Sequence, residues 1–298
     1  MQSNDKLSQA MQSVGDEISR TLDHLIEPVS GVRGRVIEAM RYASLGGGKR
    51  LRPFLLVSTA DLFNVPRHSS LRAGAAVEMI HCYSLIHDDL PTMDDSDVRR
   101  GRPSVHKKFD DATAILAGDG LLTQAFEVLA NPKTAEDADI RLQLIARLAA
   151  AAGAAGMVGG QMIDIFPKQE QLDLEGISEL QRLKTGALIK FSCLGGAILG
   201  RAQADATSAL TNYAANLGLA FQIVDDLLDA EGTEEEMGKP TGQDADLNKA
   251  TFVKLLGHKG ARTKAETLVK DACEQLTLFG PKAERLGEVA RFVINRRW

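Results

Sequence analysis

The chain has 298 residues, of which 44% are hydrophobic and 25% are charged. These values are ordinary for a soluble globular protein, and the length is ample for a large buried core. The net charge is −5, from 35 basic and 40 acidic residues, so no general positive field would attract nucleic acid. The three cysteines are widely spaced and form no CxxC pair. Neither a zinc-finger spacing nor a disulfide framework is indicated, and we expect a reducing, cytoplasmic compartment.

The amino-terminal residues are polar, and no signal peptide is expected there. The longest uncharged run, 148–163, consists mostly of alanine and glycine. It is short for a bilayer span and only weakly apolar, so we expect no membrane-spanning helix.

Apolar residues recur at steps of three and four in the first third of the chain. The pattern predicts amphipathic helices over 7–22, 32–45, 54–63 and 71–90. The run GGGKRLRP (46–53) interrupts it, since glycines end a helix and proline suits the first turn of the next. No Ser or Thr follows its lysine, so it is not a Walker A loop. Two interpretations stay open: a basic anion pocket, or a connecting turn with solvated charges.

The segment IHDDLPTMDDSDVRR (86–100) contains five carboxylates in a stretch of ten residues, and two arginines follow them. Pro91 should end the preceding helix near Leu90, which places Asp88 and Asp89 on the last turn, where the helix dipole disfavours anions. A divalent cation would reverse that penalty, and aspartate-rich clusters suit Mg²⁺. The arginines would then bind phosphate oxygens. The alternative is a solvated acidic turn.

The middle of the chain is rich in alanine and glycine. A helix over 110–130 is followed by a break, and 140–165 predicts a central buried helix that bends at Gly159-Gly160. Gln161 and Asp164 share a face of that helix, where they either point at a site or bridge two helices. A further helix, 177–200, contains Lys184, which either snorkels to water or faces a cavity. The Thr-Gly pair that follows Lys184 should loosen this helix and free a carbonyl.

A second acidic cluster ends the helix predicted over 208–229. Asp225 and Asp229 are four residues apart and share a face, and Gln222, Asp226 and Asp229 form a neighbouring stripe. Two acidic helix ends are more specific than one, and they predict facing carboxylates that share metal ions. The polar segment 231–247 then predicts a lid, and 251–298 predicts further helices. No strand run of note is present, so we expect one all-α domain over 1–298, with roughly ten or more helices around a deep central cavity.

In its motifs the chain resembles the trans-isoprenyl diphosphate synthase family, and within it the bacterial farnesyl diphosphate synthases. The motifs follow the family's order: GGGKRLRP (46–53), HDDLPTMDDSDVRRGRP (87–103), LKTG (183–186), FQIVDDLLD (221–229) and GK…D…K (238–249). The resemblance implies a homodimeric, Mg²⁺-dependent prenyltransferase. Such an enzyme condenses isopentenyl diphosphate with dimethylallyl or geranyl diphosphate to give (2E,6E)-farnesyl diphosphate.

The resemblance also implies a role for each matching residue. Six aspartates would bind three Mg²⁺ ions on the allylic diphosphate: Asp88, Asp89, Asp94, Asp225, Asp226 and Asp229. The same diphosphate would contact Arg99, Lys184, Lys239 and Lys249. The diphosphate of isopentenyl diphosphate would contact Lys49, Arg52, His81 and Arg100. Thr185 and Gln222 would offer oxygens near the allylic cation. A lone histidine such as His81 is otherwise an ordinary core residue.

Product length is predicted from sterics. Tyr83 lies five residues before Asp88, about 7.5 Å along the helix axis, and its ring would close the floor of the cavity. The family rule is similar: an aromatic residue at this position limits the product near C15. The alternative is that Tyr83 is only a core aromatic.

Three other functions remain open. A geranylgeranyl diphosphate synthase would perform the same chemistry for one more cycle. A terpene cyclase is disfavoured by the DDLLD run (225–229) and by Arg99-Arg100. A non-catalytic subunit of a heteromeric synthase should have lost carboxylates or basic residues that this chain keeps.

Overall fold

The structure is a computed structural model that describes residues 2–165, 172–231 and 250–296. Nearly all regular structure is helical, and the expected all-α class is confirmed. The described residues also contain one short antiparallel pair, β1 (Val98–Arg99) with β2 (Arg102–Pro103), where the sequence showed no strand run. The chain forms two compact units. We call residues 8–146 with 198–200 the amino-terminal unit, and residues 1–7, 147–197 and 201–298 the carboxyl-terminal unit. The single domain and its central cavity stay predictions.

The amino-terminal unit is built around one long helix, α4 (Arg67–Asp88), which packs against α3 (Leu51–Asp61) and α6 (Asp111–Ala130). It also contains α1 (Gln2–Leu25) from residue 8 onward, α2 (Gly34–Ser44), α5 (Val105–Lys108) and α7 (Ala138–Ala152) up to residue 146. Leu7, Val14, Ile18 and Leu22 of the predicted stripe on α1 are buried. The helical spacing of apolar residues therefore predicted the packed faces correctly.

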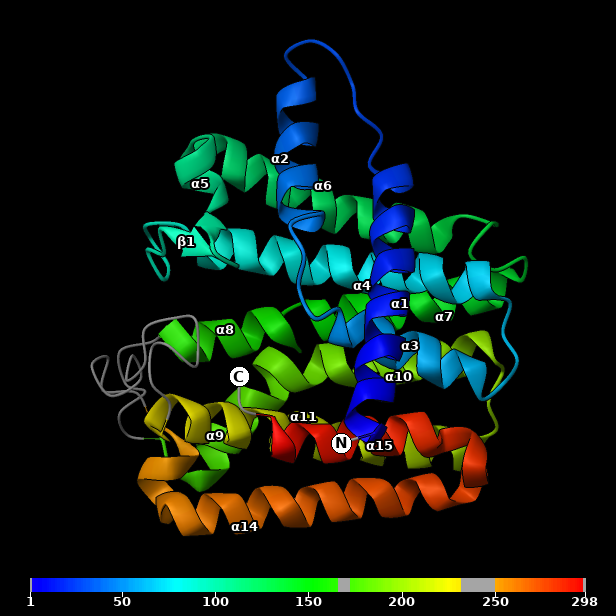
Figure 1. Ribbon diagram of the computed structural model, residues 1–298. Coiled ribbons are helices and arrows are strands. Elements are labelled where there is room, and N and C mark those ends of the chain that lie inside the picture. Colours follow the sequence, from blue (N-terminus) through cyan, green and yellow to red (C-terminus); the bar gives the residue numbers. More distant parts are fainter. Residues whose placement is uncertain (1, 166–171, 232–249, 297–298) are drawn as a thin grey trace. The chain divides into compact units, whose positions relative to one another are not determined.

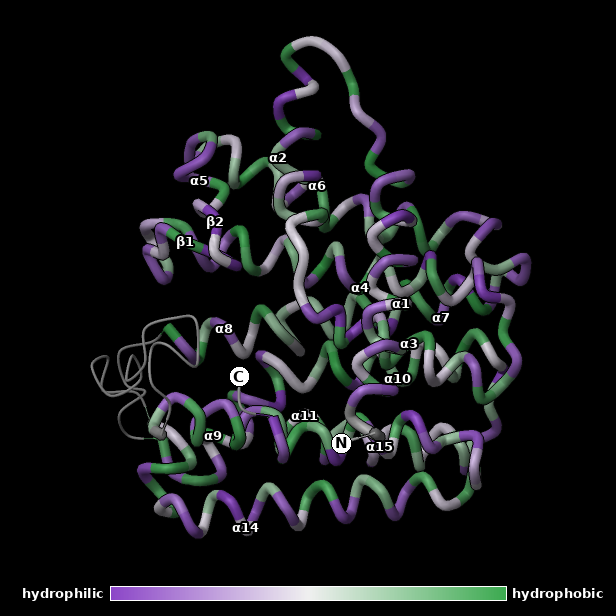
Figure 2. The backbone as a smooth tube through the Cα atoms, viewed as in Figure 1, coloured by the Kyte–Doolittle hydropathy of each residue, from purple (hydrophilic) through white to green (hydrophobic). Residues whose placement is uncertain are grey.

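The carboxyl-terminal unit is centred on α11 (Ala204–Glu231), which lies along α14 (Phe252–Gln275) and contacts α15 (Glu284–Asn295). Buried Ala261, Ala265, Val269 and Ala272 follow one face of α14, and Figure 2 shows hydrophobic and hydrophilic residues alternating along it. The unit also contains α8 (Met157–Ile165), α9 (Leu174–Gln181), η2 (Arg182–Gly186) and η3 (Leu276–Ala283). Of α10 (Ala187–Leu199), the part up to Ala197 belongs to this unit.

The prediction for 140–165 was wrong in two respects. The helix is interrupted at 153–156, between α7 and α8, and not at Gly159-Gly160. It is also not fully buried, because several large apolar side chains are 44 to 64% exposed: Leu142, Val158, Met162 and Ile165. By length and composition alone, 138–165 is apolar enough to cross a membrane. This is weak evidence for a membrane span, because core helices of soluble proteins pass the same test.

Candidate active site

The first acidic segment begins where α4 ends, at Asp88, slightly before the predicted boundary. Asp89 follows as the C-cap and is 2% exposed. The guanidinium of Arg99 donates to one oxygen of this carboxylate from Nε at 2.9 Å and from Nη2 at 2.5 Å. Burial raises the pKa of Asp89, and the pair with Arg99 opposes that shift. A turn joins the helix end to Asp94, whose backbone N–H donates to the Asp88 carbonyl.

The electrostatics place these groups close together. Burial lowers the pKa of Arg99, but the hydrogen bond and charge of Asp89 and the charges of Asp94 and Asp88 raise it above its ordinary value. Asp89 thus contacts Arg99, and the charges of Asp88 and Asp94 are near enough to act on it. In the ligand-free protein, Arg99 neutralises part of this negative charge.

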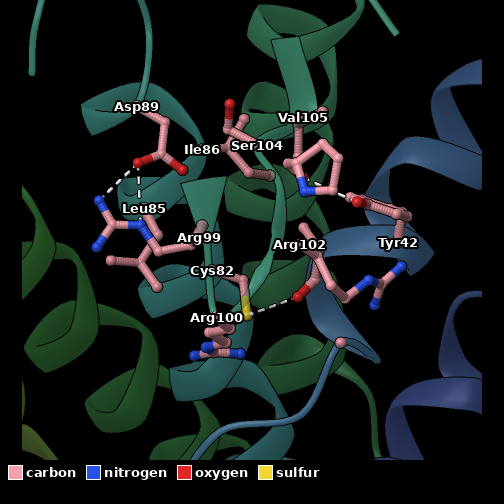
Figure 3. Close-up of a pocket in the computed structure, with 13 residues that line it drawn as sticks. Tyr42, Cys82, Leu85, Ile86, Asp89, Arg99, Arg100, Arg102, Ser104 and Val105 are labelled. Atoms are coloured by element: carbon pink, nitrogen blue, oxygen red, sulfur yellow. Dashed lines mark hydrogen bonds and ion pairs between the residues drawn. The ribbon is translucent and has the colours of Figure 1, made fainter. Parts of the chain in front are cut away.

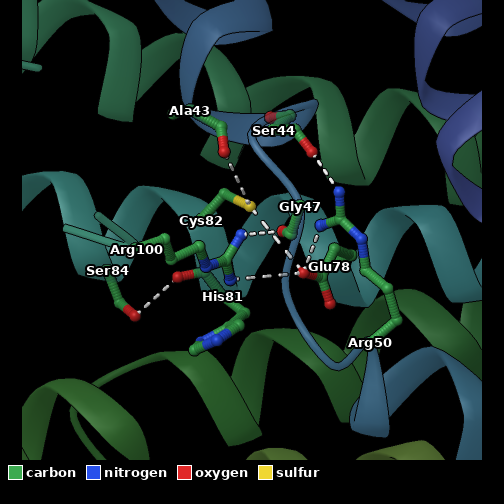
Figure 4. A network of polar contacts seen from close by, with 9 residues as sticks. All are labelled: Ala43, Ser44, Gly47, Arg50, Glu78, His81, Cys82, Ser84 and Arg100. Carbon is green, nitrogen blue, oxygen red and sulfur yellow. Dashed lines mark hydrogen bonds and ion pairs between the residues drawn. The ribbon is translucent and has the colours of Figure 1, made fainter. Parts of the chain in front are cut away.

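The glycine-rich run contains a buried ion pair that the sequence interpretation missed. Arg50 lies in the left-handed region at φ 49° and donates to Glu78 of α4 at 2.6 Å, with both side chains 2% exposed. The same guanidinium donates to the Ser44 carbonyl. Arg100 donates to the Gly47 carbonyl and lies 3.8 Å from Glu78 (Figure 4). A glutamate inside the apolar run 75–80 was the available signal, since a buried charge requires a partner.

These contacts show that the run is not a wholly solvated turn, because the charge of Arg50 is buried and paired. An anion pocket at the run stays a prediction. Gly48 has φ 117°, and an added Cβ would lie 2.7 Å from the guanidinium carbon of Arg100. A side chain at Gly48 would therefore displace Arg100. Lys49 is exposed on the same turn.

Positive charge surrounds His81 on α4. Burial, then the charges of Arg52 and Arg100, with smaller contributions from Arg50 and Arg99, hold the pKa of His81 well below its ordinary value. The imidazole is therefore neutral near pH 7. The structure thus brings His81, Arg52 and Arg100 together, as expected for a shared diphosphate site.

A small cavity of about 40 Å³ lies between α2, the end of α4 and the β1–β2 pair (Figure 3). Its wall includes Asp89, Cys82 and three arginines, Arg99, Arg100 and Arg102. The volume holds a water molecule but no diphosphate. A substrate would have to displace the arginine side chains seen here.

Tyr83 is 7% exposed, and its ring packs edge-on against His87, with 5.7 Å between centroids. His87 is fixed in turn by its contact with the Ile115 carbonyl at 3.1 Å and by Gly118 of α6, where an added Cβ would lie 2.1 Å from the ring. Burial and the charge of Asp88 raise the pKa of Tyr83 to about 12. The phenol is thus un-ionised and rigidly held near Asp88.

The second acidic segment lies on the last turns of α11. Asp225 pairs with Arg296 at 2.6 Å, and Arg296 also donates to the Phe221 carbonyl and stacks 3.8 Å over the Phe221 ring. Asp226 is 7% exposed and accepts the backbone N–H of Phe252 at the start of α14. Asp229 is partly exposed. A charged residue this near the carboxyl end would by itself suggest a solvated tail, but the side chain of Arg296 is 4% exposed.

Lys184 lies in η2, a π-helical turn where the Thr-Gly loosening was expected, so that prediction is confirmed. Its ammonium pairs with Asp164 of α8 at 2.6 Å. Asp164 thus bridges two helices, one of the two alternatives for that residue. Gly160 lets the two helices approach closely, since a Cβ there would lie 2.2 Å from the backbone nitrogen of Lys184. Gln161 has both amide atoms buried without a partner among the described residues.

Thr185 is partly exposed in the same turn. Gln222 donates to the Gln181 side chain at 2.8 Å. Lys239 and Lys249 lie outside the described residues, as does the predicted lid. A larger cavity of about 470 Å³, between α7, α9, α10 and α11, is lined by Leu183 and Gly186 but not by Lys184 or Thr185.

Comparisons with known proteins agree with these motifs. A family model described as polyprenyl synthetase matches residues 34–278. Farnesyl diphosphate synthase of Geobacillus stearothermophilus is 46% identical over 97% of this chain and 96% of that protein. The Escherichia coli protein of the same name is 41% identical over 97% and 98%. A crystal structure titled as a FPP/GFPP synthase from Zymomonas mobilis aligns with a TM-score of 0.88 and 47% identity, covering 97% and 99% of the two chains.

Proposed function

Since the chain belongs to the polyprenyl synthetase family, we propose that it is a farnesyl diphosphate synthase. It condenses isopentenyl diphosphate with dimethylallyl or geranyl diphosphate and releases diphosphate. The observation that carries this proposal is identity of 41 to 46% to farnesyl diphosphate synthases over 97% of the chain. The sequence also has an aspartate or a basic residue at each position where the family motifs require one.

The donor set fits Mg²⁺, because carboxylate oxygens are the ligands that this hard ion prefers. Asp88, Asp89 and Asp94, with Asp225, Asp226 and Asp229, would hold three ions on the allylic diphosphate. When bound, Mg²⁺ neutralises the charge that develops on a leaving diphosphate. Asp89 must then give up part of its pairing with Arg99, and Asp225 part of its pairing with Arg296.

The basic residues divide between the two diphosphates. Arg99, Lys184, Lys239 and Lys249 bind the allylic one, and Lys49, Arg52, His81 and Arg100 bind that of isopentenyl diphosphate. The surroundings of His81 support this assignment: burial is the main cause of its lowered pKa, and the charges of Arg52 and Arg100 lower it further. An arginine released from a carboxylate presents two parallel donors to phosphate oxygens.

The reaction breaks the allylic C–O bond and forms a carbon–carbon bond to the terminal alkene carbon of isopentenyl diphosphate. The departing diphosphate takes the proton that is then lost. Thr185 and Gln222 supply oxygens near the allylic cation, and apolar walls exclude water. Asp164 fixes the ammonium of Lys184.

Tyr83 limits the product near C15. Its burial and its fixed contact with His87 support a rigid barrier. In an assay with Mg²⁺, isopentenyl and geranyl diphosphates, Tyr83→Ala should give longer products by chromatography, and EDTA should abolish turnover. An unchanged product distribution in Tyr83→Ala would remove this assignment.

One relative supports a second candidate. A geranylgeranyl diphosphate synthase of Cyanophora paradoxa is 40% identical over 88% of this chain. A C20 main product from the unaltered chain would establish that function instead. No turnover by the purified chain would favour a non-catalytic subunit of a heteromeric synthase.

The protein acts as a cytoplasmic homodimer. The exposed apolar side chains along 138–165 support this, because subunit contact would bury them. Met162→Glu should produce monomers in light scattering, whereas Gln143→Glu on the same segment should not.

A further inference from the structure

A group of possible metal ligands lies beside the predicted magnesium ligands, and it consists of other residues. Asp95, Asp97 and His106 each offer one ligand atom, and these atoms all lie within 4.8 Å of one another. Asp95 and Asp97 are exposed on the turn after α4, and His106 belongs to α5. An acidic pair on a turn is common without an ion, so the histidine decides whether this is a site.

His106 is 6% exposed, and its Nε2 is buried without a hydrogen-bond partner in the described structure. The other ring nitrogen lies 3.2 Å from the Ser104 hydroxyl. A buried polar nitrogen without a partner costs free energy, and metal coordination would remove that cost. One ring nitrogen of His106 also lies within 4.8 Å of both carboxylate oxygens, so the imidazole is placed as a ligand.

The donor types select the class of ion. Imidazole suits Zn²⁺, Co²⁺ and similar transition ions, whereas Mg²⁺ takes oxygen ligands. Two carboxylates with one imidazole would leave a position for water, as in open zinc sites. Ligand atoms around a tetrahedral zinc are about 3.4 Å apart, so atoms that lie up to 4.8 Å apart must approach by at most about 1.4 Å. The two aspartates are exposed and can rotate to do so.

One protein cation competes for the site. The ammonium of Lys107 lies 2.9 Å from Asp97, and the hydrogen bond and charge of Asp97, then the charge of Asp95, raise the pKa of Lys107. Lys107 is itself exposed and can swing into solvent. The local negative charge therefore already attracts a cation.

We propose that Asp95, Asp97 and His106 form a second metal site, for a transition ion such as Zn²⁺, distinct from the predicted magnesium ligands. The ion ties the turn after α4 to α5. It thereby fixes the stretch between Asp94 and Arg99, whose two ends carry predicted ligands. The site does not depend on the proposed prenyl transfer.

The test uses the full chain in excess Mg²⁺, which occupies sites made only of carboxylates. Bound Zn²⁺ is counted by mass spectrometry after equilibrium dialysis, and ¹⁵N-histidine NMR detects ring coordination. We expect one zinc and one shifted imidazole signal that His106→Gln removes. Asp97→Asn should lower the zinc affinity at least about 100-fold. Lys107→Met should raise it, because it removes the competing cation.

Asp139→Asn, on an exposed turn of α7, is the matched control and should leave zinc binding unchanged. If His106→Gln fails to fold, Asp97→Asn decides the matter, since Asp97 is 70% exposed. Equal zinc binding by Asp97→Asn and the unaltered chain would overturn the proposal. Loss of the ion in Asp88→Asn but not in Asp97→Asn would assign it to the magnesium ligands and would also overturn it.

Discussion

The two acidic helix ends have similar sequences but are stabilised differently. At the end of α4, Asp89 pairs with Arg99, ten residues further along the chain. At the end of α11, Asp225 pairs with Arg296, 71 residues away, and Asp226 accepts from the backbone of Phe252. The first end is therefore neutralised by its own segment, and the second by segments that only the folded chain brings near. Removing a partner should perturb the two ends to different extents.

The largest expected effect tests whether the ends are equivalent in catalysis. Asp88→Asn and Asp225→Asn should each lower kcat/KM on the order of 10³-fold, because each removes charge that holds the metal against the leaving diphosphate. Steady-state kinetics with geranyl and isopentenyl diphosphates measures this. Asp205→Asn, exposed in the first turn of α11, should retain full activity. If only one end were sensitive, the two ends would not form a common site.

The next effect tests the buried charge beside the first end. Glu78→Gln leaves the Arg50 guanidinium buried without its carboxylate, so the free energy of unfolding should fall by about 3–5 kcal/mol. Urea denaturation measures it. The double variant Arg50→Met/Glu78→Leu should recover most of the loss. If the double variant were as unstable as the single one, the loss would come from the missing ion pair itself and not from an uncompensated buried charge.

A smaller effect tests the long-range partner of the second end. Arg296→Ala removes a hydrogen bond, an ion pair and a stacking contact, and should cost about 1–3 kcal/mol in unfolding free energy. Because Arg296 competes with a metal ion for Asp225, the variant should also reach half-maximal activity at lower Mg²⁺. Arg285→Ala, on the first turn of α15, is the control. A higher Mg²⁺ requirement in Arg296→Ala would contradict the competition.

The smallest effect depends on pH. His81 has a depressed pKa in the folded protein, so below about pH 6.5 the unfolded chain takes up a proton that the folded chain does not. Stability is therefore retained above pH 6.5 and falls as pH drops towards the folded pKa, by up to about 1.4 kcal/mol per pH unit. His81→Gln should flatten this part of the pH profile of thermal denaturation.

Local sequence signals predicted the helices, the turn at 46–50 and the loosening near Lys184. Each of these depends on residues within one or two turns, such as Pro53 or the Thr-Gly pair. The break was predicted at the wrong glycines, and the structure has it at 153–156. A glycine permits a helix to bend, but when several glycines are present the sequence does not show which one is used. Whether 140–165 is buried depends on what packs against it, and its composition does not contain that information.

The site followed the same division. The residue types of the two acidic ends predicted metal ligands, and their family motifs predicted the basic residues. The partners that now hold these side chains, such as Arg296, Phe252 and Asp164, come from distant segments. Arg50 and Glu78 were missed because pairing across 28 positions leaves no periodic trace.

The π-helical turn at 182–186 has a consequence for how insertions and deletions are tolerated. A π turn contains one residue more than an α turn, and it absorbs that residue by widening. Deleting one residue there would leave an α turn, and the residues beyond it would keep nearly the same rotation about the helix axis. Leu188 and Phe191 would then stay in the core, whereas the turn's own Lys184 would lose its place beside Asp164. A one-residue deletion at this turn should therefore cost less stability than one in the middle of α10, and its main effect should fall on a predicted phosphate ligand.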